Sequence, residues 1–170
     1  LRDGKAVLSD VFFTAPFKVM LPFYLREDYM QVMVLSASAG IMEGDVQKFD
    51  IHVNPGTSLE YLSQAYEKIH KMKEGMARRE TKIVVEPEAF LKYAPLPTIP
   101  FRDSAFENHL EIELKEKTSR LLFQEILSCG RAACGEAFAY RFYHNHVAVR
   151  EEGNLIYLDN TRYDPEFFEM

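Results

Sequence analysis

Apolar and polar residues alternate along most of this chain, which is the pattern of half-buried β-strands. One arrangement occurs four times: two alternating apolar residues, a polar turn, and then a Leu followed two residues later by an aromatic residue. The apolar pairs are Ile51/Val53, Ile83/Val85, Ile112/Leu114 and Val147/Val149, and the pairs that follow them are Leu59/Tyr61, Leu91/Tyr93, Leu121/Phe123 and Leu155/Tyr157. Each unit is therefore predicted to be a strand, a turn and a second strand.

The four leucines lie 30 to 34 residues apart. A strand–turn–strand unit repeated at this spacing is typical of stacked layers, each of which buries its apolar face only against its neighbours. We therefore predict a mainly β fold of stacked sheet layers, similar to a β-solenoid, with all four leucines buried. An antiparallel sandwich is the alternative, because its hairpins also give strand–turn–strand units.

One stretch departs from the alternation and predicts a short helix that ends near Gly75. Four apolar residues lie there at helical spacing with charged residues between them: Ala65, Ile69, Met72 and Met76. No low-complexity linker divides the chain, so residues 1–170 are expected to form one domain. Because the sequence opens without Met and stops just after two adjacent Phe residues, this domain is expected to be truncated at both ends, mainly at the C-terminus.

The composition, with 47% hydrophobic and 27% charged residues, is that of a globular protein. A net charge of −6 argues against a nucleic acid as the main partner, because phosphate binding requires a basic surface. No apolar run approaches the ~18 residues of a membrane span, and the first ten residues lack the apolar segment of a signal peptide. We therefore expect a cytoplasmic protein without membrane attachment, in which Cys129 and Cys134 are free thiols.

Two carboxylates occupy positions predicted to face the core. Glu125 and Asp159 each lie four residues after the Leu of their unit, on the same strand face as that Leu. An ionised carboxylate there needs a partner, a bound water or a metal ion, because burying it alone is costly. Carboxylate oxygens in such a place favour weak, transient binding of a divalent cation. A bulge that turns both residues to solvent is the alternative.

Other candidate sites are less specific. His144 and His146 share one strand face, but no third ligand lies at a spacing typical of a metal site. The chain has no P-loop, dinucleotide loop, zinc-binding helix motif or catalytic-triad order. Residues 38–45 and 130–136 contain glycines and are expected to form turns. In the first, Asp45 either caps the turn or binds outward, and in the second Arg131 pairs with Glu136.

Five segments, in family order, resemble motifs of the UreD/UreH family of urease accessory proteins. They are residues 13–18, 40–45, 63–68, 97–101 and 130–138, and the last resembles the family's Gly-Arg-x-x-x-Gly-Glu-x-Phe motif. The motif residues in the two turns are Gly40, Gly44, Gly130, Arg131, Gly135 and Glu136. The matches span the chain from about Phe12 to Asp159 and are nearest the Helicobacter form, UreH. The chain departs from the family at Ala39, where many members have Gly, and the family's chains continue further.

The resemblance implies a chaperone subunit for nickel insertion, and not an enzyme. It implies a complex with UreF and the GTPase UreG that docks on apo-urease, as a dimer of heterocomplexes. It also implies that nickel passes in transit through an internal acidic tunnel, without an organic cofactor. The matching acidic residues are Asp45, Glu125 and Asp159, together with Glu67 at a position that is polar in relatives.

Two other functions remain as alternatives. A hydrolase or lyase on a β-stack would use Glu125 and Asp159 as acid and base, although a chain without Trp is a poor candidate for a sugar-binding groove. A pure scaffold would have no metal route at all. A nickel titration with and without the acidic residues distinguishes a scaffold from a conduit.

Overall fold

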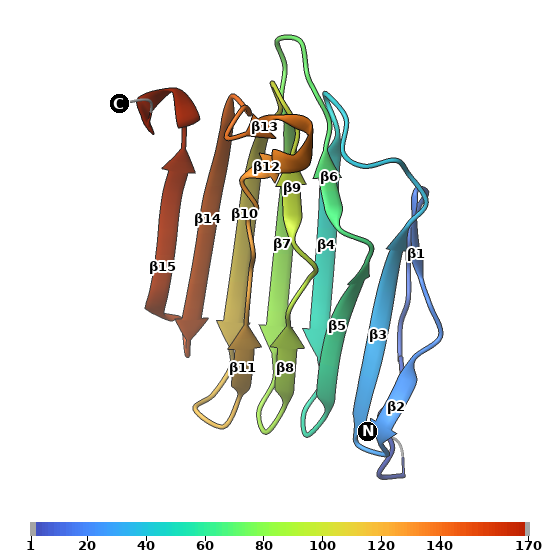
Figure 1. Cartoon of the computed structure of the whole chain (residues 1–170). Helices are drawn as coiled ribbons and strands as arrows, with labels where there is room; N and C mark the ends of the chain where they lie inside the picture. The colour runs from blue at the N-terminus through green and yellow to red at the C-terminus, as the bar shows by residue number, and fades with distance from the viewer. Residues whose placement is uncertain (1–2, 169–170) are drawn as a thin grey trace.

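The computed structural model describes residues 3–168, and its strands lie side by side in two layers (Figure 1). One sheet contains, in spatial order, β15 (Asn154–Tyr163), β14 (Phe142–Glu151), β10 (Ala105–Leu114), β7 (Ala77–Val85) and β4 (Val46–Val53). The other contains β1 (Phe17–Val19), β3 (Tyr29–Ser36), β5 (Ser58–Gln64), β8 (Phe90–Tyr93) and β11 (Arg120–Phe123), and β2 (Phe23–Arg26) pairs with β3. The prediction of a mainly β fold is confirmed.

Short elements complete the chain. Strand β6 (Glu67–Ile69) pairs with β9 (Thr98–Pro100), and β12 (Gly130–Arg131) pairs with β13 (Glu136–Ala137). In the described part of the chain, the helices are two 3-10 turns, η1 (Ala132–Cys134) and η2 (Pro165–Phe168). Within residues 3–168, no helix is long and apolar enough to cross a membrane.

The first three sequence units stack as predicted. Each polar turn carries the chain from the first sheet to the second, so that β4, β7 and β10 lie parallel in one layer and β5, β8 and β11 in the other. Leu91 pairs in register with Leu59 on one side and Leu121 on the other. Tyr93 stacks on Tyr61 at a ring-centroid distance of 4.8 Å. This parallel arrangement confirms the stacked, β-solenoid-like fold and excludes the antiparallel sandwich.

The fourth unit does not follow the other three. Strand β15 turns back and pairs antiparallel with β14 in the same sheet. The cause is the two-residue turn Glu152-Gly153, whose φ angles of +50° and +78° are those of a tight hairpin turn. Leu155 is consequently 51% exposed, so the prediction that all four leucines are buried is wrong for this one. Leu121 is only partly buried.

The helix expected between Ala65 and Gly75 is also absent from the structure. Residues 67–69 form β6, which pairs parallel with β9, and the following residues form a loop. Ile69 and Met72 are buried, as the apolar spacing required, but Met76 is 38% exposed. Pairing with a distant strand therefore overrode the local helical periodicity.

One polar row crosses the first sheet within its mostly apolar inner face. Gln47, Arg79, Asn108 and Asn145 occupy paired positions on four neighbouring parallel strands. The paired row next to it on one side includes Leu110 and Val147, which belong to the larger hydrophobic cluster. The row on the other side includes Phe106 and Tyr143, which belong to the second cluster. The polar row therefore separates two hydrophobic cores and positions the candidate site between them.

Candidate functional site

Three of the four predicted acidic residues line one pocket of about 420 Å³ that is open to solvent. Glu67 comes from β6, Glu125 from the segment after β11, and Asp159 from β15. Arg79 and Asn145 of the polar row also line this cavity. Three elements far apart in the sequence thus bring their carboxylates to the space between the two hydrophobic cores.

Side-chain amides of the polar row hold two of these carboxylates. Asn108 Nδ2 donates to Glu125 Oε1 at 3.0 Å, and Asn145 Nδ2 donates to Glu125 Oε2 at 3.2 Å. The same Asn145 nitrogen donates to Asp159 Oδ2 at 2.9 Å, and the Thr161 hydroxyl donates to Asp159 Oδ1. Both carboxylates therefore point to Asn145 on the inner face of the first sheet, and not to solvent as the alternative required. Strand β15 does contain a bulge, between Leu155 and Tyr157, so that Leu155 does not share the face of Asp159 as the alternation predicted.

Glu67 has a different partner. Its Oε2 lies 2.6 Å from Arg79 Nη2, and the two side chains are 21% and 12% exposed. Arg79 Nε and Nη2 also donate to Gln47 Oε1, at 3.0 and 2.6 Å. The rings of Phe49 and Phe106 lie 5.5 and 5.7 Å from the guanidinium carbon. The charge of Glu67 is thereby neutralised, whereas Glu125 and Asp159 are held by neutral amides and a hydroxyl.

Burial raises the pKa values of several groups that line the pocket. Burial raises the pKa of Glu125 above its ordinary value, although the amides of Asn145 and Asn108 favour the ionised form, and the charge of Asp159 adds to the increase. Burial also raises the pKa of the Tyr93 and Tyr143 hydroxyls, which line the same cavity. At neutral pH these tyrosines are neutral, so they contribute hydroxyl groups and no charge.

The raised pKa of Glu125 predicts how stability depends on pH. The folded state binds this proton more tightly than the unfolded state, whose carboxyl titrates near 4.5. Stability from this group is therefore present below pH 4.5 and is lost as pH rises through the folded pKa. We expect the free energy of unfolding of wild type, relative to Glu125→Gln, to be more favourable at pH 4 than at pH 7.

Urea denaturation of both proteins at a series of pH values measures this difference. Glu125→Gln also loses one amide hydrogen bond. This loss lowers the free energy of unfolding of the variant by the same amount at every pH, so it does not change how the difference between the two proteins depends on pH. The raised pKa of Glu125 is contradicted if the difference in free energy of unfolding between the two proteins does not change with pH, or if it grows in favour of wild type as pH rises.

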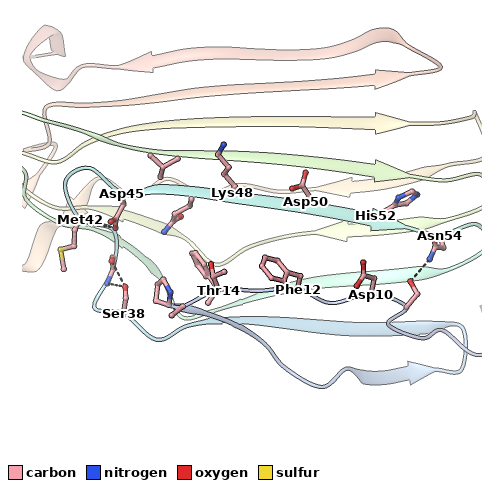
Figure 2. A pocket seen from close by; sticks show the side chains of 17 residues that line it. Asp10, Phe12, Thr14, Ser38, Met42, Asp45, Lys48, Asp50, His52 and Asn54 are labelled. Carbon is pink, nitrogen blue, oxygen red and sulfur yellow. Dashed lines mark hydrogen bonds between the residues drawn. The ribbon is translucent and has the colours of Figure 1, made fainter.

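Asp45, the fourth predicted acidic residue, lies apart from the cavity. It lines a groove of about 1020 Å³ between β4 and the segment that contains Asp10, Phe12 and Thr14 (Figure 2). Its Oδ2 accepts the backbone N–H of Met42 at 2.8 Å and so caps the turn before β4. The structure thus places Asp45 in the capping role, one of the two that the sequence left open.

The motif glycines shape corners outside the cavity. At Gly130, with φ +111°, a Cβ would lie 2.4 Å from the Glu136 carbonyl oxygen, and at Gly40, with φ +146°, one would lie 2.4 Å from the Lys68 oxygen. Arg131 forms the expected ion pair with Glu136, at 2.7 Å between Nη2 and Oε1. Its guanidinium carbon lies 3.9 Å from the centroid of the Phe101 ring. The remaining motif residues, Gly44 and Gly135, have φ angles of +84° and +71°.

The sequence interpretation missed the polar row itself. A signal was present, because its residues each lie four positions before an apolar residue of the same inner face, two rows further along the strands: Gln47 before Ile51, Arg79 before Ile83, Asn108 before Ile112 and Asn145 before Val149. Each residue taken alone resembles an ordinary exposed polar position. Only their common offset from the repeated unit distinguishes them.

Other predicted features lie elsewhere. His144 and His146 do share a face of β14, and the ring of His109 on β10 lies 5.5 Å from that of His146. Cys129 and Cys134 are free, as predicted. For residues 3–168, no three His, Cys, Asp or Glu side chains are arranged so that they could hold a metal ion.

Comparisons with known proteins place these features in a family context. The family model described as "UreD urease accessory protein" matches residues 1–170. The chain is 41% identical over 168 residues to urease accessory protein UreH of Helicobacter pylori (strain HPAG1), covering 99% of this chain and 63% of the relative. It is 44% identical over 161 residues to UreD of Acetivibrio thermocellus, covering 94% and 61%. UreH of Helicobacter hepaticus is 38% identical over 168 residues, covering 99% and 66%. The chain thus spans less than two thirds of the length of the first two of these relatives.

Proposed function

Because the chain belongs to the UreD family of urease accessory proteins, we propose that it acts in urease maturation and passes Ni²⁺ through its acidic interior. In this role it is a chaperone subunit of the cytoplasm and not an enzyme. It holds UreF and the GTPase UreG on apo-urease, in a dimer of heterocomplexes. Nickel is the cargo, and no organic cofactor takes part.

The observation that carries the nickel proposal is the convergence of Glu67, Glu125 and Asp159 on one pocket. Among residues 3–168, Glu125 and Asp159 have amide and hydroxyl partners but no ion-pair partner within 4 Å, so a divalent cation is attracted to them electrostatically. Oxygen ligands hold Ni²⁺ less tightly than imidazole or thiolate does, which suits transit better than storage. The amides of Asn108 and Asn145 orient the carboxylates without neutralising them.

Exposed apolar surface supports the scaffold part of the proposal. Phe23, Tyr24 and Leu25 of β2 are each more than half exposed at one end of the stack. Leu155, Ile156, Tyr157 and Leu158 of β15 are about half exposed at the other. Apolar side chains gathered in this way are typical of protein–protein contact sites. We propose that these two faces bind the partner proteins.

Co-purification and enzyme activation test this function. The chain is mixed with UreF, UreG and apo-urease, the complex is isolated by gel filtration, and urease activity is measured after nickel is added. We expect the chain to elute with UreF and to raise urease activity above that of a mixture without it. Tyr24→Glu on β2 and Leu158→Glu on β15 identify the binding face, with the exposed Lys82→Glu as a matched control. A chain that ignores UreF and leaves urease inactive contradicts the proposal.

A further inference from the structure

The first sheet ends at β4, and the outer edge of this strand is open. Among the described strands, β4 pairs with β7 alone, whereas the second sheet continues past this point with β3 and β1 (Figure 1). Residues 9–14 run beside β4 but form no strand, and within residues 3–168 no backbone hydrogen bond joins them to β4. The chain therefore presents an eight-residue strand edge that faces the groove at Asp45.

The hydrogen bonds to β7 show which backbone groups of this edge are available. The carbonyl oxygens of Asp45 and Val53 accept hydrogen bonds from the N–H groups of Arg78 and Glu86, each at 3.0 Å. In a parallel ladder the N–H and C=O groups of successive residues point alternately to the two sides of the strand. The backbone groups directed at the groove are therefore those of Val46, Lys48, Asp50 and His52.

The charge left over in the groove is negative. Lys48 Nζ lies 3.5 Å from Glu80 Oε2, and His52 Nε2 lies 2.7 Å from Glu86 Oε1, so both of these basic side chains already have anionic partners. The lining also contains three aspartates that have no ion-pair partner within 4 Å among residues 3–168: Asp10, Asp45 and Asp50.

These aspartates are spread along the groove. Figure 2 shows Asp45 near one end of β4, Asp50 further along the strand, and Asp10 on the opposite wall towards the other end. Apolar surface accompanies them, because Phe12 is 86% exposed and Val46 is 50% exposed. An extended segment that carries several basic residues and some apolar ones is complementary to the groove along its whole length.

We infer that this groove binds an extended, basic segment of a partner protein, which joins the first sheet as a strand beside β4. In such strand addition, backbone hydrogen bonds give affinity and the alternate side chains give specificity. A single strand suits this place better than a second copy of the whole chain, because β1, β3 and residues 9–14 flank the edge. The site is separate from the β2 and β15 faces, and it does not depend on the passage of nickel.

A synthetic peptide tests the site. The probe is an eight-residue peptide of alternating Lys and Val, capped at both ends and labelled with fluorescein, and its binding to the 170-residue chain is followed by fluorescence anisotropy. We expect binding that weakens as salt is added. Replacing Lys by Glu in the peptide, or methylating the backbone nitrogens that face β4, should weaken binding at least about tenfold, because the first change reverses the charge and the second removes hydrogen-bond donors. Hydrogen exchange at the backbone amides of Val46, Lys48, Asp50 and His52 should slow when the peptide is bound.

Two substitutions in the chain test its side of the contact. Asp50→Lys reverses the charge beside the edge and should weaken peptide binding at least about tenfold. Glu111→Lys is the matched control, because it makes the same charge change at an exposed position of β10 in the same sheet, and it should leave the affinity unchanged. Lys48→Pro removes an N–H from the open edge but none from the ladder with β7, and it should also weaken binding. If this variant does not fold, the methylated peptides test the same hydrogen bonds.

Three results would overturn the inference. The first is equal weakening by Asp50→Lys and Glu111→Lys, because binding then follows the total charge of the chain. The second is the absence of peptide binding, or slowed exchange at amides outside β4 and not at those of β4. The third is a wild-type chain that elutes as a dimer in gel filtration while Asp50→Lys elutes as a monomer, because the edge then binds a second copy of the chain and not a peptide segment.

Discussion

Replacing Glu125 and Asp159 together by alanine is expected to lower urease activation by at least about tenfold, while the chain stays folded and bound to UreF. Within residues 3–168, these two carboxylates line the pocket without a cationic partner in contact, so removing them removes the attraction for Ni²⁺ on the proposed route. The fold is expected to survive, because loss of a buried carboxylate also removes the cost of burying its charge.

Activation of apo-urease in the presence of UreF and UreG measures this effect, and a calorimetric nickel titration measures the lost binding. The matched control is Glu111→Ala plus Glu166→Ala, which removes two exposed carboxylates and leaves the interior unchanged. If the inner double variant activates urease as well as wild type, these residues have no role in nickel transfer. If the complex with UreF falls apart instead, their role is structural and the pure scaffold gains support.

Leu91→Ala is expected to destabilise the fold by about 2–5 kcal/mol, the usual range for truncation of a buried leucine. Leu91 is fully buried and is paired between Leu59 and Leu121, so its loss opens a cavity in the middle of the stack. Urea denaturation followed by circular dichroism gives the free energy of unfolding. Leu155→Ala is the matched control, because the same side chain in the fourth unit is 51% exposed, and it should change stability by about 0.5 kcal/mol or less. Equal costs for the two substitutions contradict the assignment of three stacked units and one hairpin.

The repeated Leu–aromatic pattern favoured the stack over the sandwich, and three of its four units follow it. Alternation fixes which residues of a strand share a face, and a face with Leu91 and Tyr93 must be covered by neighbours with matching apolar residues. The same reasoning predicted that Glu125 faces inward, because it shares the alternation of Leu121 and Phe123. The motif comparison predicted the family, which the comparisons with known proteins show.

Turn length was decisive where the pattern failed. The first three units have turns of four or five residues, which carry the chain across to the other sheet. The fourth has only Glu152 and Gly153, which fold the chain back on itself and leave Leu155 exposed. The short turn is visible in the sequence. The alternation pattern alone, however, does not specify whether the strand after the turn pairs within the same sheet or crosses to the other one.

Only the tertiary structure decided the partners of the charged and polar side chains. Residues 67–69 lie in a stretch with helical apolar spacing, yet they form a strand because they pair with β9. That pairing places Glu67 beside Arg79, which comes from β7 and is held by Gln47 of β4. The sequence by itself therefore determined which faces of the strands are buried, because that depends on local alternation. Which carboxylate meets an arginine, an amide or only its own turn depends on contacts between distant segments, which no local pattern specifies.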